Sequence, residues 1–292
     1  MIDPADEYQR HLTPVLGWRM AYVDEGRGRT VIFIHGNATH SYFWRNALGY
    51  VATKSRSIAI DLPGMGASEP FRPSGRNSYQ IPDLVTQVWS MIDSLRLPSP
   101  WVLVGHELGA LIAADIARAR PFETAGLVLI DPAIDAADTT SWDPEVVKIV
   151  ELIRSDDGER EMLMENVIIE RYLPSLVNRR LSPYEMERYR RPYVEGGEKS
   201  RPLISLMRAL PIEGDPGPIK ETVDTARAWC RTTSVPKLIV TGDPGFLVSP
   251  HRAAAWKRWN ATTVEVVPGS HFLMEDSPDR ITASIRSWLE TI

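Results

Sequence analysis

A glutamate stands between two glycines directly after an apolar, strand-like segment. The stretch WVLV (101–104) runs through GHELG (105–109) into an Ala-rich helical stretch (110–119). A strand, a tight turn with small flanking residues and a helix form the pattern of a nucleophile elbow, which holds its central side chain at the tip of a strained turn. A carboxylate at this tip can attack an electrophilic sp³ carbon and form an ester that water then cleaves. We therefore predict that Glu107 is a nucleophile.

A histidine near the end of the sequence is the expected general base. His271, in VVPGSHF, precedes a predicted helix (278–292), and the chain order nucleophile, acid, histidine matches the α/β-hydrolase pattern. Two acids could orient it: Asp131 in LVLIDPAI, or Asp243 in VTGDPGFLVSP. We favour Asp131, because the acid position of the common G-x-x-D-x-x-V pattern falls on Gly245, and Asp243 lies two residues before it.

The FIHGN segment is expected to complete the site. In this fold, the loop after an early strand and the residue after the nucleophile each supply a backbone N–H group that stabilises negative charge. Those donors would be Asn37 and Leu108. His35 is expected to hydrogen-bond the backbone of its own loop and to take no part in catalysis.

Six short apolar runs are predicted to be strands buried on both faces, because their residues do not alternate between apolar and polar. Helical segments such as 83–95 lie between them, which indicates a mostly parallel, doubly wound α/β sheet. The alternation stops at 132–235, where helical periodicity at 145–154 and 161–172, and a Ser182 N-cap before Pro183, predict a helical cap. Residues 1–131 and 236–292 would form the core domain. The predicted strands are 31–34, 57–60, 101–104, 127–130, 238–241 and 263–267.

Composition and motifs limit the possible partners. The 292 residues carry 33 basic and 38 acidic side chains, a formal charge of −5, with no basic cluster, so nucleic acid is not expected as a partner. A single cysteine, a polar N-terminal segment and no apolar run of about 18 residues favour a cytoplasmic protein that does not bind membranes. No metal or organic cofactor is expected, because neither a Gly-rich phosphate loop nor HExxH occurs. Oligomeric state stays open.

Four segments resemble the haloalkane dehalogenases, a family that also includes Renilla-luciferase-like relatives: HGNATHSYFWRN, IAIDLPGMGASE, LVGHELGALIAADIARARP and PGSHFLMEDSPDRI. The similarity continues through ERYLPSLVNRRLSPYEMERYRRPYV, LPIEGDP and VPKLIVTGDPG, and so covers nearly the whole chain. The resemblance implies an α/β-hydrolase fold, with Glu107 as nucleophile, His271 as base and Asn37 as a side chain that stabilises halide. Asp131 stands where the HGN branch of the family keeps a glutamate.

This sequence departs from the family at two positions of the predicted catalytic site. The family nucleophile is aspartate, so Glu107 moves the carboxylate by about 1.5 Å, one carbon–carbon bond. The family also places a tryptophan after the nucleophile, whose indole N–H binds halide, whereas Leu108 offers no side-chain donor.

The leading interpretation is a hydrolase that cleaves a carbon–halogen bond in an apolar small molecule. Epoxide hydrolysis is an alternative, for which a cap tyrosine would protonate the leaving oxygen; Tyr172, Tyr184, Tyr189 and Tyr193 are candidates, although each could simply pack in the cap. Glu107 could instead be a general acid/base in an elimination or cyclisation of secondary metabolism. A fourth interpretation is a binding protein that holds an apolar molecule under its cap with little catalysis.

Overall fold

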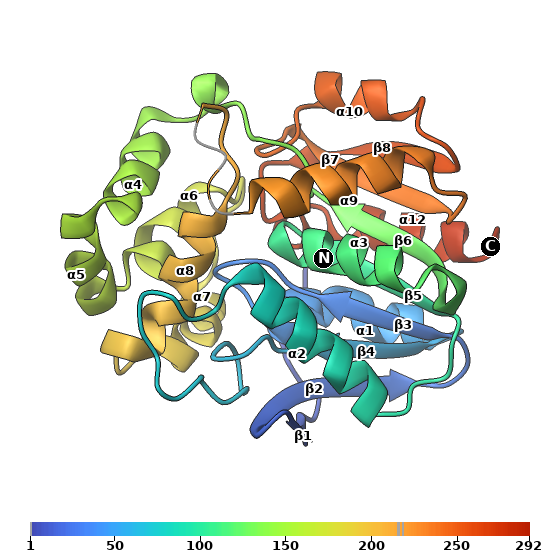
Figure 1. Cartoon of the computed structure of the whole chain (residues 1–292), viewed down its shortest axis with the longest axis horizontal. Coiled ribbons are helices and arrows are strands. Elements are labelled where there is room, and N and C mark those ends of the chain that lie inside the picture. The colour runs from blue at the N-terminus through green and yellow to red at the C-terminus, as the bar shows by residue number, and fades with distance from the viewer. Residues whose placement is uncertain (1, 215–216, 218) are drawn as a thin grey trace.

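Eight strands form one sheet in the order β1-β2-β4-β3-β5-β6-β7-β8 (Figure 1). The computed structural model describes residues 2–214, 217 and 219–292. Strands β3 to β8 pair in parallel, whereas β1 and β2 are antiparallel additions at one edge. The predicted mostly parallel sheet is confirmed. The strands are β1 (His11–Val15), β2 (Trp18–Gly26), β3 (Thr30–Ile34), β4 (Arg56–Ile60), β5 (Trp101–His106), β6 (Thr124–Ile130), β7 (Lys237–Pro244) and β8 (Thr262–Gly269).

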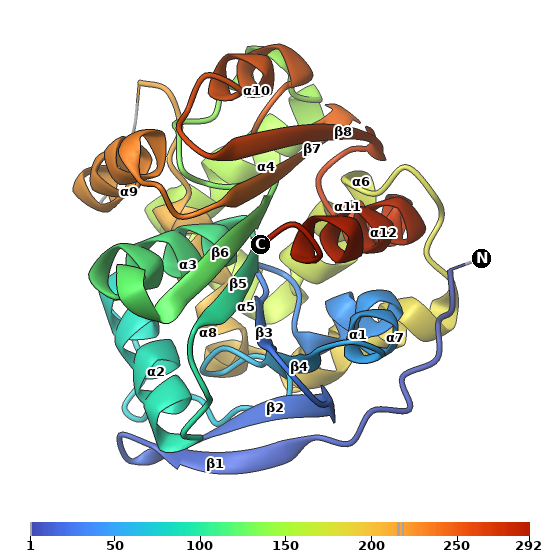
Figure 2. The same cartoon turned by 90° about the vertical axis from the view of Figure 1, so that its right-hand side faces the viewer.

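Helices cover both faces of this sheet. Figure 2 shows α2 (Ile81–Ser94), α3 (Leu108–Ala119) and α9 (Lys220–Thr232) on one face, with α1 (Arg45–Ala52) and α12 (Pro278–Leu289) on the other. Every residue of β3 and β5 is therefore buried, which explains why neither strand alternates in hydrophobicity. Two more core helices, α10 (Pro250–Trp256) and α11 (Leu273–Asp276), accompany β7 and β8.

A second group of helices gathers at one end of the sheet, on the left of Figure 1. The chain enters this group after β6, and Ala137 pairs with Ile212 in a parallel bridge where it leaves. Helix α9 then packs against α3 and so belongs to the layer that covers the sheet. Asp215 and Pro216 of the LPIEGDP segment lie outside the described residues. The helices of the group are α4 (Pro144–Arg154), α5 (Asp156–Glu165), α6 (Leu173–Ser175), α7 (Pro183–Arg190) and α8 (Arg201–Ala209).

The predicted helix at 161–172 is interrupted at Asn166. Helix α5 ends at Glu165, Asn166 adopts a left-handed φ of 51°, and a π-helical turn follows at Ile168–Tyr172. Asparagine tolerates this conformation, and its amide donates a hydrogen bond to the Tyr193 carbonyl. Periodicity alone predicted one helix, because the apolar spacing continues across the break.

The start of α7 follows the sequence prediction. Ser182 accepts a hydrogen bond from the Glu185 N–H group, and the Glu185 carboxylate accepts one in return from the Ser182 N–H group. This capping box satisfies two N–H groups that would otherwise lack a partner at the helix start.

The described residues contain neither a helix long and apolar enough to cross a membrane nor a group of three or more potential metal-ligating side chains. The one cysteine, Cys230, is buried on α9. Burial raises the pKa of its thiol to about 12, so it stays protonated and unreactive at neutral pH.

Candidate active site

Glu107 occupies the sharp turn between β5 and α3. Its φ of 53° and ψ of −121° are unusual for a residue with a side chain and mark the strain of an elbow. A Cβ atom on Gly105 would lie 2.5 Å from the Ala110 Cα atom, and one on Gly109 would lie 2.3 Å from the Ile34 carbonyl oxygen. The two glycines are thus required for the close approach of strand and helix. The turn places Glu107 beneath the cap, where it is only 1% exposed.

Backbone N–H groups hold the Glu107 carboxylate. The Asn37 N–H group donates to Oε2 at 2.5 Å, and the Leu108 N–H group lies beside the same carboxylate and helps to lower its pKa. Gly36 leaves room for this contact, because a Cβ there would lie 2.4 Å from Oε2. Burial raises the pKa of Glu107, although the His271 charge and the two N–H groups oppose this rise. Both predicted anion-binding N–H groups therefore contact the predicted nucleophile itself.

His271 and Asp131 form a buried hydrogen-bonded pair. His271 Nδ1 lies 2.7 Å from Asp131 Oδ2. Asp131 also accepts hydrogen bonds from the N–H groups of Leu247, at 3.2 Å, and Val248, at 3.0 Å. Two backbone N–H groups and the imidazole thus converge on the Asp131 carboxylate, which orients the ring with Nδ1–H toward Asp131 and leaves Nε2 as the nitrogen that can act as a base. Asp243 is exposed at the end of β7.

Two other buried histidines have structural roles. His35 hydrogen-bonds the Gly36 carbonyl through Nδ1 at 2.8 Å and accepts from the Leu62 N–H group through Nε2 at 2.9 Å. Burial lowers its pKa to about 4, so it is neutral at physiological pH. His106 donates from Nε2 to the His271 carbonyl at 3.0 Å and so braces the loop that carries the predicted base. In the sequence, His106 carries no signal beyond its position next to Glu107 in GHELG.

The Asn37 side chain connects the core to the cap. Its Nδ2 donates to the Leu203 carbonyl of α8 at 3.0 Å, and its Oδ1 accepts from the Ala38 N–H group. One of its two amide hydrogens is thereby committed to the protein. The Leu108 side chain is buried and carries no donor. A role for Asn37 toward a leaving halide stays a prediction.

The four cap tyrosines differ sharply in their surroundings. Tyr184 is 50% exposed, and the Tyr189 hydroxyl donates to the Glu275 carboxylate. The hydroxyls of Tyr172 and Tyr193 are buried and lack a hydrogen-bond partner within the described residues. Burial and the charges of Glu107 and Asp131 raise the pKa of Tyr172, whereas Glu275 is the carboxylate that acts on Tyr189 and Asp61 the one that acts on Tyr193.

A buried ionic network links the cap to helix α11, which follows His271. Arg45 forms two hydrogen bonds with Glu275, at 2.6 and 2.7 Å, and one with Glu185 of α7 at 3.0 Å. Arg179 of the cap bonds the same two carboxylates. No sequence motif predicts this network, because its four members come from three distant parts of the chain and each looks like an ordinary surface charge in the sequence.

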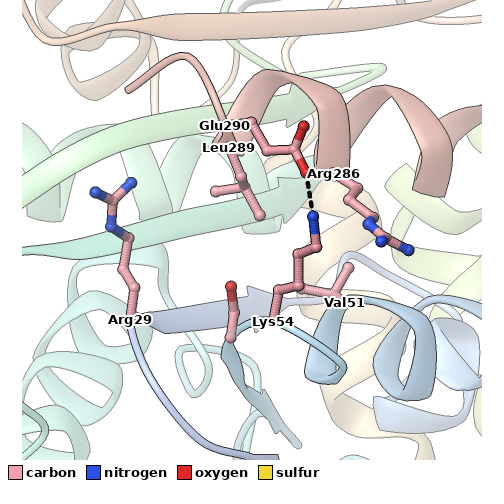
Figure 3. A pocket seen from close by; sticks show the side chains of 7 residues that line it. Arg29, Val51, Lys54, Arg286, Leu289 and Glu290 are labelled. Carbon is pink, nitrogen blue, oxygen red and sulfur yellow. Dashed lines mark hydrogen bonds and ion pairs between the residues drawn. The ribbon is translucent and has the colours of Figure 1, made fainter.

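We expect Glu275→Ala to destabilise the fold by about 3 kcal/mol, because removal of one member of a buried ionic group leaves the Arg45 charge under-compensated. Urea unfolding would measure this loss. The matched control is Glu290→Ala, which removes the exposed Lys54–Glu290 pair, 2.6 Å between Nζ and Oε1 (Figure 3). Solvent screens that pair, so its loss should change stability little. Similar losses in both variants would contradict a special role for the buried network.

The pocket drawn in Figure 3 lies away from the site. Its volume is about 190 Å³, and Arg29 and Lys54 bring it to the amino ends of β3 and β4. Glu107 follows the carboxyl end of β5, at the opposite edge of a parallel sheet. We therefore assign this pocket no part in the chemistry of Glu107.

Glu107→Gln should make the protein more stable at pH 7. Burial raises the folded-state pKa of Glu107 above the ordinary 4.5, so ionisation of this carboxyl opposes folding once the pH exceeds 4.5. A neutral isostere removes that penalty, and a gain on the order of 1 kcal/mol would raise Tm by roughly 2 to 4 °C. Below pH 4.5 the carboxyl is protonated in both states and the gain should vanish. A pH series of melting curves would test this; a gain independent of pH would contradict it.

Comparisons with known proteins identify the fold and the family. The model of the Alpha/beta hydrolase family matches residues 31–284, so the fold and the elbow together define an α/β hydrolase. A haloalkane dehalogenase of Mycolicibacterium smegmatis is 37% identical over 277 residues, which cover 94% of this chain and 89% of the relative. The crystal structure of a haloalkane dehalogenase from Bradyrhizobium elkani superposes with a TM-score of 0.89 at 34% identity, over 98% of both chains. The chain belongs to the haloalkane dehalogenase family and is a hydrolase of that fold.

One relative carries a different activity in its name. Coelenterazine h 2-monooxygenase of Renilla reniformis is 34% identical over 266 residues, or 90% of this chain and 84% of the relative. Relatives of similar identity thus differ in activity, so the residues of the site must decide which reaction this chain catalyses.

Proposed function

We propose that this protein hydrolyses carbon–halogen bonds in apolar small molecules through an ester on Glu107. The observation that carries the proposal is a buried elbow carboxylate, bonded to the Asn37 N–H group, in a site that also contains the His271–Asp131 pair. One carboxylate oxygen attacks the sp³ carbon, the carbon–halogen bond breaks, and its electron pair leaves with the halide. The haloalkane dehalogenases among its relatives support this choice of leaving group.

The N–H groups around Glu107 favour an sp³ carbon over an acyl carbon as the point of attack. In enzymes that cleave acyl groups, such donors bind the oxyanion that forms on the substrate. Here the Asn37 N–H group is already bonded to Oε2 of Glu107. After alkylation of the other oxygen, Oε2 becomes the carbonyl oxygen of the ester. When water attacks that ester, negative charge develops on Oε2, and the same donor stabilises it.

His271 supports the second step as a general base. Its Nε2 takes a proton from water, which adds to the ester carbonyl carbon, and the alcohol then leaves as Glu107 is restored. Asp131 holds Nδ1–H and stabilises the imidazolium that forms.

A single-turnover reaction in ¹⁸O-labelled water would test the proposal on a panel of bromoalkanes, chloroalkanes and epoxides. We expect bromide release, an alcohol with unlabelled oxygen and ¹⁸O in the Glu107 carboxylate, because water attacks the ester and not the substrate carbon. Label in the alcohol would show direct attack by water. Diol formation from epoxides without any halide release, or an alkene as product, would overturn the proposal.

A further inference from the structure

Tyr172 lies in the same aromatic cluster as the proposed base. It is the last residue of the π-helical turn in the cap and is 1% exposed. Its ring meets Phe246 and Phe272 edge-on, with centroids 6.3 and 6.4 Å apart. Both phenylalanines in turn contact the His271 ring, at 5.0 and 4.7 Å. Tyr172, which follows the break at Asn166, is therefore a cap residue that packs in the same aromatic cluster as the proposed base of the core domain.

The Tyr172 hydroxyl is buried without a hydrogen-bond partner in the described part of the chain. A buried hydroxyl left unpaired costs about 1 to 3 kcal/mol, so such a group is rarely retained without a use. The negative charges of Glu107 and Asp131 both act on this hydroxyl. Together with the aromatic cluster that joins Tyr172 to the His271 ring, these charges place the unpaired donor in the neighbourhood of the proposed nucleophile.

The displacement step needs a donor that this hydroxyl can supply. Negative charge moves from Glu107 to the departing atom, and a placed donor lowers the barrier for that transfer. Leu108 has no side-chain donor, and one amide hydrogen of Asn37 is already hydrogen-bonded to the Leu203 carbonyl. The Tyr172 hydroxyl, by contrast, is a buried donor without a protein partner in the described part of the chain, and the charge of Glu107 acts on it.

We propose that the Tyr172 hydroxyl donates a hydrogen bond to the halide as it leaves. This inference rests on the proposed function, since it assigns the partner of the leaving group in that reaction. The bond from Glu107 to carbon forms as the carbon–halogen bond breaks, the electron pair departs with the halide, and Tyr172 keeps its proton throughout. Burial and the two nearby carboxylates raise the pKa of Tyr172 well above 10, so it remains a neutral O–H donor at any working pH.

Tyr193 provides a matched control within the same cap. Its hydroxyl is also buried and unpartnered among the described residues, but Asp61 and Tyr79 are the groups that act on it. Both Tyr172→Phe and Tyr193→Phe remove only an unpaired hydroxyl, so neither variant should lose thermal stability.

The experiment compares chloro-, bromo- and iodoalkanes that share one alkyl group. In Tyr172→Phe, single-turnover ester formation should fall ~100-fold for chloride and distinctly less for iodide, because chloride is the poorer leaving group and the stronger hydrogen-bond acceptor. Hydrolysis of the preformed ester should keep its rate, since halide has already left. Tyr193→Phe should match the parent in both steps. Equal losses for all three halides, or no loss, would overturn the role of Tyr172.

Bromide binding gives a readout that does not need turnover. Titration of sodium bromide into the folded parent and Tyr172→Phe, followed by calorimetry, should show affinity about tenfold weaker in the variant. If the parent formed no ester with any haloalkane, the proposed function would fail, and this titration would still decide the assignment. Weaker bromide binding in the variant would support Tyr172 as the halide donor; equal binding, or none in the parent, would overturn it.

Discussion

His271→Phe is expected to stop turnover while leaving an alkyl ester on Glu107. Displacement of halide needs no base, so the first step should proceed and release one equivalent of bromide. Water would then lack a proton acceptor, and steady-state turnover should fall ~1,000-fold. The ring is buried against Phe246 and Phe272, which makes phenylalanine a suitable replacement for packing. Intact-protein mass spectrometry after exposure to a bromoalkane should show the added alkyl group, and peptide mapping should place it on residue 107.

The trapped ester distinguishes Glu107 as a nucleophile from Glu107 as a general acid/base and from a site that only binds. The double variant Glu107→Gln with His271→Phe is the control and should gain no mass, because an amide is a poor nucleophile. Bromide release from His271→Phe at the parental steady-state rate would remove His271 from the mechanism. A folded variant with neither adduct nor bromide would contradict a covalent route and would favour acid/base chemistry or simple binding.

Sequence patterns located the parallel core because each pattern there has a local physical cause. Strands β3 and β5 are buried on both faces, so their apolar runs are unbroken. The glycines of the elbow stand where a Cβ would collide with backbone. The edge strands β1 and β2 were not predicted; their exposed and buried residues alternate or mix, and short amphipathic segments of this kind give a weaker signal.

The cap was harder to predict because its structure depends on contacts between distant segments. Asn166 ends a helix whose apolar spacing continues, and hydrogen bonds to Tyr193 and from Ser200 fix its left-handed conformation. Likewise, four cap tyrosines look equivalent in the sequence. Only the folded chain shows that the Tyr189 hydroxyl donates to Glu275, that Tyr184 is exposed, and that the Tyr172 hydroxyl has no partner within the described residues.

The candidate site also contains residues that local motifs predict and contacts that they do not. Glu107, Asn37 and His271 each follow a strand within a recognisable motif, and the structure brings all three together with Asp131. The brace from His106 to the His271 loop and the Arg45–Glu275 contact join residues that are 165 and 230 positions apart in the chain, which no local pattern encodes.

Asp131→Asn should reduce turnover by ~1,000- to 10,000-fold with little effect on folding. The introduced asparagine can keep the left-handed φ of 38° and can still accept from the Val248 N–H group through its one oxygen. Its NH₂ group would face His271 Nδ1, however, and would favour the tautomer in which Nε2 carries the proton. The imidazole could then neither accept a proton from water nor be stabilised as an imidazolium. Steady-state alcohol release and the lifetime of the ester on Glu107 would measure the loss.

Asp243→Asn is the matched control, because it makes the same chemical change on an exposed carboxylate at the end of β7. It should leave both steps near the parental rate. The two variants also divide the reaction: Asp131→Asn should slow ester hydrolysis far more than ester formation, since only hydrolysis uses the base. Equal losses in the two variants would move the acid role away from Asp131. A loss in Asp131→Asn that fell wholly on ester formation would instead show that Asp131 acts on the charge of Glu107, and that its hydrogen bond to His271 holds the loop in place without serving the base.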